Sequence, residues 1–293
     1  MFTDYARFHH FALIAFAALT FAPLHSQDSL FVVGGHWTQV PDSIHVLRLS
    51  GTSSWSEANS VVLREANVPS ELIITNLDSL NHQWSLHVEG FQPVDLPANS
   101  SVSIELPALP LGAYRFGLID PQGLGLGAQG MLQVGLANSA PMPENLFHWN
   151  LCDWETDELV EWGLGNVPDL TNPYVPNYFT INERVYPNTL EDPNAVVQVN
   201  LGDTCWIAVA NHGQMDHVLH FHGFHVKVLT SNMQPERIGW SKDTVPVKRG
   251  EAMTLELVVN QVGTYPVHDH NLIAVTNAGF YPGGMLTQIQ VAP

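Results

Sequence analysis

Apolar stretches of strand length, separated by turns rich in glycine and proline, follow one another along most of the chain. Glycine and proline number 22 and 20, and only 13% of the residues are charged, a composition that favours short strands and many turns over long surface helices. The pattern therefore predicts an all-β protein. The clearest strand-like stretches are 72–76, Ser101–Leu106, 205–211, 218–228, 252–259 and 263–270.

These stretches form a degenerate internal repeat. In each copy, a strand leads into a histidine-containing strand, and a Gly-x-Tyr stretch then precedes a Gly-Met-Leu stretch. Repeated units of this size, made of short strands and turns, predict two β-sandwich domains, at 27–140 and 177–293. The matching positions are His82 with His217, His87 with His222, Tyr114 with Tyr265, and Met131 with Met285.

Residues 141–176 separate the two copies. This segment is rich in Pro, Asn, Asp and Trp and has no steady hydrophobic period, so we expect a linker and not a third domain. Trp149, Trp154 and Trp162 predict that the linker is ordered, because large apolar side chains would pack against the domains.

The N-terminus has the pattern of an export signal. Residues 11–22 are apolar, Arg7 precedes them, and small-residue cleavage could occur before Gln27. We therefore expect a signal peptide at 1–26 and a periplasmic or secreted protein. An uncleaved anchor is the alternative, although an apolar run of about a dozen residues is short for a bilayer, and no stable membrane span is expected.

Charge and cysteine content narrow the function classes. Lys and Arg number 10 and Asp and Glu 28, for a formal charge of −18, so the chain has no basic patch to follow a phosphate backbone, and nucleic acid is excluded as an expected partner. Cys152 and Cys205 could pair in an oxidising compartment, but the sequence leaves their pairing open.

Two His-x-His pairs carry the candidate chemistry. In a strand, residues i and i+2 project from the same face, so His220 and His222 present two adjacent imidazoles, as do His268 and His270. If the two strands meet, four imidazoles form one cluster. Imidazole suits copper, zinc, iron or nickel, which predicts a metal ion as a partner. Ordinary core or surface histidines are the alternative.

At these residues the chain resembles the multicopper oxidase family, which is built from cupredoxin (plastocyanin-like) domains. Residues 263–270 are similar to the family's last copper motif, in which His-Cys-His follows a Gly-Thr-aromatic turn, and residues 217–223 are similar to its His-x-x-His-x-His-Gly motif. The resemblance implies two Greek-key β-sandwiches and copper as the cofactor. Related two-domain proteins are often trimers, so it also implies a homo-oligomer.

The departures from the family pattern concern its blue type 1 copper site. Asp269 stands where the family has the copper-binding cysteine, and Ala274 stands where it has the second histidine, whereas Met285 can match the axial methionine. A blue site needs two histidines and a thiolate, so no complete blue centre is expected. Asp269 should point to the face opposite His268, towards His217.

The first domain departs further. The family's trinuclear copper cluster takes eight histidines from two domains, and this chain offers four from one domain with His87 from the other, so a complete cluster is not expected. His87, His217 and Asp269 remain secondary candidates for metal binding or for contacts to metal ligands. The positions that have lost their histidine are Ser85, Gly117 and Ile119.

Three functions stay open at this point. The first is an exported copper-binding protein of the multicopper oxidase family, with its copper at the four paired histidines. The second is a copper-dependent oxidoreductase that uses dioxygen as acceptor. The third is a non-catalytic cupredoxin interaction module. The sequence does not decide whether the chain is an enzyme.

Overall fold

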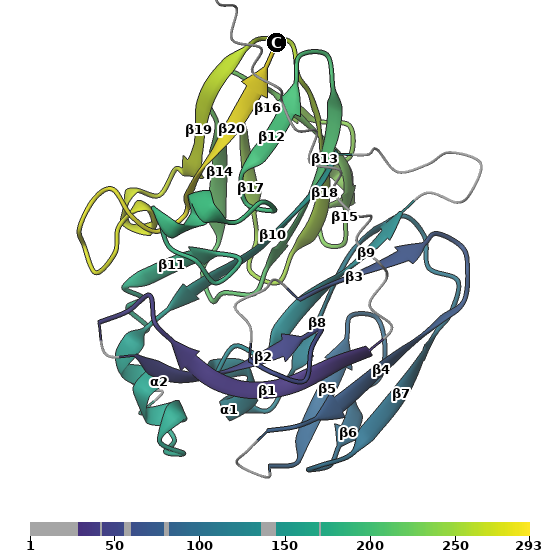
Figure 1. Cartoon of the computed structure of the whole chain (residues 1–293), viewed down its shortest axis with the longest axis vertical. Coiled ribbons are helices and arrows are strands. Elements are labelled where there is room, and N and C mark those ends of the chain that lie inside the picture. The colour runs from purple at the N-terminus through teal and green to yellow at the C-terminus, as the bar shows by residue number, and fades with distance from the viewer. Residues whose placement is uncertain (1–28, 42, 56–59, 79–81, 136–144, 170) are drawn as a thin grey trace, which may run out of the picture.

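The computed structural model describes residues 29–293 except 42, 56–59, 79–81, 136–144 and 170. The described chain forms two β-sandwiches, each made of two sheets (Figure 1). This confirms the all-β, cupredoxin-like fold. In the first sandwich a four-stranded sheet has the order β2-β1-β4-β7 and a five-stranded sheet the order β3-β9-β8-β5-β6. In the second, a six-stranded sheet has the order β11-β10-β13-β18-β15-β16 and a five-stranded sheet the order β12-β20-β19-β14-β17.

The strands of the first sandwich are β1 (Ser29–Trp37), β2 (Ile44–Ser50), β3 (Val61–Glu65), β4 (Ser70–Asn76), β5 (Trp84–Val88), β6 (Val94–Leu96), β7 (Ser101–Leu106), β8 (Gly112–Leu118) and β9 (Gln129–Gly135). Those of the second are β10 (Asn145–Trp154), β11 (Tyr178–Ile181), β12 (Val197–Asn200), β13 (Thr204–Asn211), β14 (His217–Phe221), β15 (Val226–Ser231), β16 (Ser241–Lys242), β17 (Thr244–Val247), β18 (Ala252–Val258), β19 (Gly263–Asp269) and β20 (Leu286–Ala292). The helices are α1 (Pro121–Gly125), α2 (Thr156–Gly163) and the 3₁₀-helices η1 (Asn188–Glu191), η2 (Pro235–Arg237) and η3 (Leu272–Val275).

Strand pairing repeats from one sandwich to the other. β1 runs parallel to β4 as β10 does to β13, and β3 runs parallel to β9 as β12 does to β20. The antiparallel pairs β5–β8 and β14–β19 also correspond. The internal repeat seen in the sequence is thus a repeat of topology.

Strand β10 lies inside the segment 141–176, for which the sequence predicts a linker. It pairs with β11 and β13, so it belongs to the second sandwich and takes the place that β1 has in the first. Nearly all of β10 is buried, because Trp149 packs in the core of the second domain and Trp154 in that of the first. A strand buried on both faces loses the alternation of apolar and polar residues that would reveal it. In the described part of this segment, Trp162 of α2 also packs in the first core.

The two domains also contact each other through small side chains and a buried ion pair. Ala113 of β8 packs with Ala208 of β13 and Ala252 of β18, which lets the sheets approach closely. Arg48 Nε of β2 lies 2.9 Å from Glu183 Oε2, just after β11, and both side chains are buried. These contacts hold the domains in one arrangement.

The two cysteines do not pair. Both are free and buried, and Cys205 of β13 lies opposite Asn145 of β10. Cys152 is further along β10 by seven residues, about 23 Å at 3.3 Å per residue, whereas a disulfide needs Cα atoms within about 7 Å. The predicted signal peptide at 1–26 lies outside the described residues. Among the described helices, none is long and apolar enough to cross a bilayer.

Candidate metal centre

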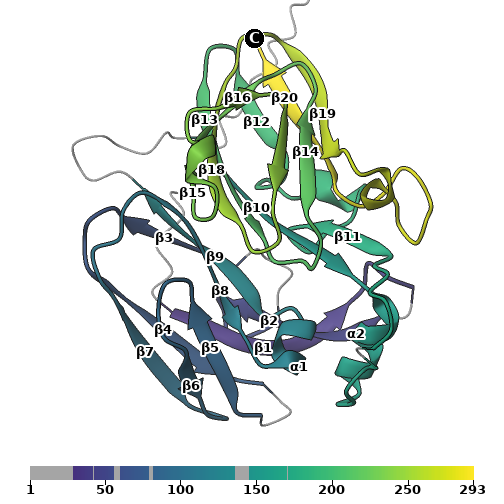
Figure 2. The same cartoon turned by 180° about the vertical axis from the view of Figure 1, so that it is seen from behind.

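The structure brings the four paired histidines together. β14 and β19 lie side by side in the second domain (Figure 2), and His220 is directly opposite His268 in their register. The ring centres of His220 lie 4.5 Å from His222 and 5.6 Å from both His268 and His270. The ring centres of His222 and His268 are 5.1 Å apart. The two His-x-His pairs therefore meet on neighbouring strands, as the sequence predicts.

Hydrogen bonds assign the nitrogens available to a ligand. His268 Nδ1 lies 2.8 Å from the carbonyl oxygen of Asp269, which can only accept, so this nitrogen carries the proton and Nε2 holds the lone pair. His220 Nδ1 is 2.9 Å from Thr244 Oγ1 of β17, which leaves its Nε2 free. Metal-binding histidines usually use their second nitrogen in this way, because the bond orients the ring.

The closest approach fits two ligands of one metal ion. His222 Nε2 lies 3.0 Å from His268 Nε2. A metal ion holds imidazole nitrogens at about 2.0–2.1 Å, so two ligands at a right angle would be about 2.9 Å apart. Burial, with the neighbouring His220 and His268, lowers the pKa of His222 and keeps its ring neutral, as coordination requires.

The four rings do not yet form a closed cage. Among the described residues, no group of three or more His, Cys, Asp or Glu side chains is placed so that it could hold a metal ion as it stands. His222 and His270 are exposed, however, and His220 and His268 are half-buried. Coordination by all four therefore requires the exposed rings of His222 and His270 to turn.

Behind this group, on the inner face of the same strands, lies a buried charge network. His217 Nδ1 is 2.6 Å from Asp269 Oδ2, and His217 Nε2 is 3.2 Å from Asp153 Oδ2. Carboxylates only accept, so both ring nitrogens carry protons and the ring is an imidazolium. Burial opposes this charge, but the hydrogen bonds and charges of Asp153 and Asp269 prevail and raise the pKa of His217 to about 9.

This network lies at the positions where the resemblance to the multicopper oxidase family places a blue copper site. The backbone N–H of Asp269 donates to Met285, whose own N–H donates to Ala274, so the three positions are neighbours in space. The contact between Asp269 and His217 confirms the predicted direction of the Asp269 side chain. An imidazolium between two carboxylates therefore occupies the interior position at which the resemblance places a metal ion.

Sequence reasoning missed two members of the network. Asp153 lies on β10, and its Oδ1 accepts a 2.7 Å hydrogen bond from Tyr174 Oη as well as one from the backbone of Gln214. Although burial opposes it, hydrogen bonding from His217 and Tyr174 lowers the pKa of Asp153. Both residues come from the segment 141–176, where no local pattern connects them to the histidines 40 or more positions away.

His87 stands apart from the four histidines. It lies on β5 and lines a separate cavity of about 200 Å³. In the second domain the backbone N–H of His222 donates to the carbonyl of Pro266, whose counterpart in the first domain is Arg115. The sequence match of His87 with His222 would therefore place His87 opposite Arg115, but His87 lies opposite Gly117, two residues further along β8. The two strand pairs differ in register, so the match holds in sequence only. Register is set by the packing of each sheet, which sequence landmarks do not report.

Comparisons with known proteins agree with this fold. Residues 160–290 match the sequence model of the multicopper oxidase family. No curated protein sequence gives a significant match. The fold is similar to that of the blue copper oxidase from Nitrosomonas europaea, with a TM-score of 0.74 and 20% identity over 90% of this chain and 85% of that one.

Two further solved structures are similar. The multicopper oxidase mgLAC has a TM-score of 0.72 and 20% identity over 90% of this chain and 86% of that one. The copper nitrite reductase from Nitrosomonas europaea has a TM-score of 0.63 and 15% identity over 90% and 93%. These likenesses span both sandwiches, whereas the family match covers most of the second. The second domain thus carries the match to the multicopper oxidase family, and the whole chain has the two-domain cupredoxin fold that such copper proteins share.

Proposed function

We propose that the chain is an exported copper-binding protein of the multicopper oxidase family that holds copper at His220, His222, His268 and His270 and has no blue type 1 centre. The observation that carries the proposal is the 3.0 Å approach of His222 Nε2 and His268 Nε2 within a group of four imidazoles. Two neutral ring nitrogens at that separation share either a proton or a metal ion.

The donor set favours copper. All four candidate ligands are nitrogens, and at such a site Cu(II) binds more tightly than Zn(II) by the Irving–Williams order. The hydrogen bonds of His220 to Thr244 and of His268 to the Asp269 carbonyl leave Nε2 of each ring for the ion. When bound, copper would supply a redox-active centre at a half-exposed surface.

The absence of a thiolate limits the redox role. In the family the type 1 copper accepts electrons from the donor, and the resemblance matches that position to the buried network of Asp153, His217 and Asp269. A copper-binding or copper-delivering role needs no electron-entry site. The oxidoreductase alternative predicts oxygen consumption by the copper-loaded chain with an electron donor, and the proposal predicts none above free copper.

The test is a copper titration of the purified chain in competition with a chelator of known affinity. The double variant His222→Ala/His268→Ala removes the two closest ring nitrogens and should weaken copper binding at least tenfold. Mutation of residues that only hydrogen-bond to metal ligands already weakens metal affinity by that amount. His225→Ala is the matched control, because His225 is an exposed histidine of the same domain outside the group. Equal copper affinity for the wild type and the double variant would refute the copper site.

Location and assembly are further parts of the proposal. The predicted signal at 1–26 supports export, and cell fractionation with N-terminal sequencing of the mature chain would check it. The resemblance to trimeric two-domain proteins supports a homotrimer, in which His87 of one subunit could lie near the four histidines of the next. Light scattering of the copper-loaded chain should give three times the monomer mass.

A further inference from the structure

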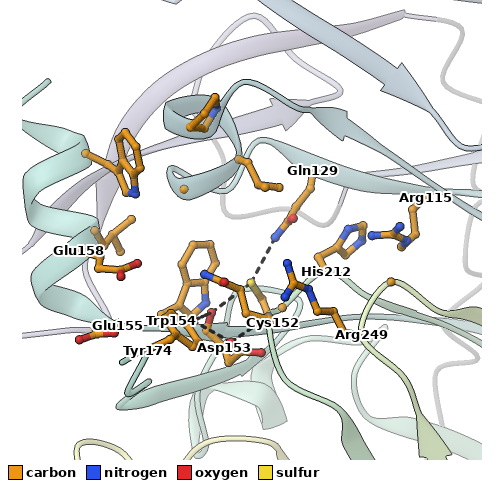
Figure 3. A pocket seen from close by; sticks show the side chains of 18 residues that line it. Arg115, Gln129, Cys152, Asp153, Trp154, Glu155, Glu158, Tyr174, His212 and Arg249 are labelled. Carbon is orange, nitrogen blue, oxygen red and sulfur yellow. Dashed lines mark hydrogen bonds between the residues drawn. The ribbon is translucent and has the colours of Figure 1, made fainter. Parts of the chain in front are cut away.

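A cavity lies between the two domains, away from the four histidines. Its volume is about 470 Å³, within the range of roughly 300–1,000 Å³ that small-molecule sites occupy, and sites of this kind often form between domains. Its walls come from β8, α1, β10 and α2 and from the loops around His212 and Arg249 (Figure 3). None of the four paired histidines lines it.

One end of the cavity is basic, in a chain that carries a formal charge of −18. Arg115 comes from the first domain and Arg249 from the second, with the half-buried His212 beside them (Figure 3). The Arg249 guanidinium has no hydrogen-bond or ion-pair partner among the described residues, and Arg115 Nε is buried without a hydrogen bond. The carboxylate oxygen Oε2 of Glu89 lies 3.9 Å from Arg115 Nε, too far for a hydrogen bond.

The guanidiniums of Arg115 and Arg249 repel each other. Burial lowers the pKa of Arg115, Glu89 raises it, and Arg249 lowers it again. Burial, with the charge of Arg115, lowers the pKa of His212 to about 3, so this ring is neutral. The carboxylate of Asp153 also lines the cavity, but it is paired with His217, so an anion bound between the two guanidiniums would complete their charge arrangement.

The remainder of the cavity is apolar or acidic. Trp154, Trp162 and Leu124 line it, and Leu124 is half exposed. Glu155 and Glu158 lie at the end away from Arg115 (Figure 3). An anion would be repelled from that end, so a bound molecule would place its charge at the arginines and its apolar body over the indoles and the leucine.

We infer that this cavity is a binding site for a small organic monocarboxylate with a planar apolar body. The carboxylate accepts hydrogen bonds from Arg115 and Arg249, one from each domain. The geometry of a guanidinium matches a carboxylate, and aromatic walls match a planar ligand. The inference does not depend on copper binding by the histidines.

The test is calorimetric titration of the full chain with benzoate, after metal has been removed and the chelator dialysed away, so that no anion can bind a metal ion. Benzoate should bind at a single site per chain and more tightly than benzamide, which lacks the charge, or acetate, which lacks the ring. The variant Arg249→Gln should weaken benzoate binding roughly tenfold or more, as the loss of a hydrogen bond to a charged group does. Arg249 is exposed, so the variant should fold.

Lys242→Gln is the matched control, because it removes one positive charge from the exposed strand β16 outside the cavity. It should leave benzoate affinity within about twofold, as expected for a screened, distant charge. Equal losses in the two variants would mean that only overall charge matters, and would overturn the inference. Binding of benzamide or acetate as tight as that of benzoate, or no saturable binding of benzoate, would also overturn it.

Discussion

Among single residues, His217 is expected to have the largest effect on the stability of the fold. Its ring lies between Asp153 and Asp269, and all three side chains are almost fully buried. Each carboxylate is stabilised by the imidazolium and by backbone N–H groups, among them those of Met215 and Asn271. A buried charge network of this kind is destabilised strongly when one member is removed, because the others stay charged and unpaired.

Replacement of His217 by alanine should therefore be costly. The variant His217→Ala leaves two buried carboxylates without their cation, and we expect the free energy of unfolding to fall by about 3–5 kcal/mol. Urea unfolding followed by tryptophan fluorescence measures this change. His225→Ala should change the same free energy by no more than about 0.5 kcal/mol, because its side chain is exposed. A loss as small for His217 would contradict the ionic network.

The same network predicts how stability depends on pH. The pKa of His217 is raised to about 9, above the value of about 6.5 expected in the unfolded chain. The folded state therefore binds the proton more tightly, and this stabilisation is complete below about pH 6.5 and is lost as the pH rises through 9. Urea unfolding between pH 6 and 10 should show a decline that is absent from His217→Gln. Parallel pH profiles for the two proteins would rule the prediction out.

Among the elements, β10 connects the largest number of features. It pairs with β11 and β13, contributes to both cores, and carries Asp153 to His217. It also carries Cys152, whose burial raises the pKa of its thiol, as burial does for Cys205 of β13. Both thiols should therefore be protonated and unreactive in the folded chain.

Thiol counting tests this placement of β10 against β13. Without any reductant, the denatured chain should give two free thiols, from Cys152 and Cys205, because the strand register keeps them apart. The folded chain should react with a thiol reagent only at the rate of unfolding. A disulfide in the oxidised protein, seen as a mass lower by two hydrogens, would show that the register of β10 and β13 is different.

The side chains carried by β14 and β19 determine the absorption spectrum expected for the copper-loaded chain. Asp269 has no sulfur, and neither Cys152 nor Cys205 lies beside the four histidines, so copper should give only the weak bands of nitrogen ligation and no intense thiolate-to-copper band. Asp269→Cys alone should not restore a blue site, because the neighbouring Ala274 supplies no imidazole. An intense blue colour in the wild type would mean that a thiolate reaches the metal.

In the whole molecule, the relative position of the domains depends on the contact between them, to which Trp154 of β10 and Trp162 of α2 contribute by packing in the first core. Small side chains such as Ala113 and Ala208 form another apolar part, and Arg48 with Glu183 forms a buried ion pair. The cavity with Arg115 and Arg249 opens beside this contact, so its shape depends on the two domains staying in place.

The buried ion pair between Arg48 and Glu183 should contribute far more to the free energy of unfolding than the exposed pair between Arg184 and Glu191. Glu183→Gln leaves the buried charge of Arg48 uncompensated and should lower the free energy of unfolding by about 3–5 kcal/mol. Arg184→Gln breaks a pair with the exposed Glu191 and should cost less than about 1 kcal/mol. Scanning calorimetry compares the two, and equal melting temperatures for the variants would show that the domain contact does not rely on this pair.

The sequence by itself determined the features that depend on local geometry. The period of two along a strand places His220 with His222 and His268 with His270, and it turns Asp269 to the opposite face, towards His217. Short strands and turns predicted the all-β class, and the repeated landmarks predicted two similar domains. These inferences need only neighbours in the chain, whose directions the backbone constrains.

Tertiary structure alone decided the features that depend on which segments meet. Asp153 became the second partner of His217 because β10 packs beside β13, and β10 shows no period because both of its faces are buried. The register that places His87 opposite Gly117, the separation of the cysteines and the cavity between the domains depend in the same way on contacts between distant residues. Such contacts follow from the packing of whole sheets, which leaves no local pattern in the sequence.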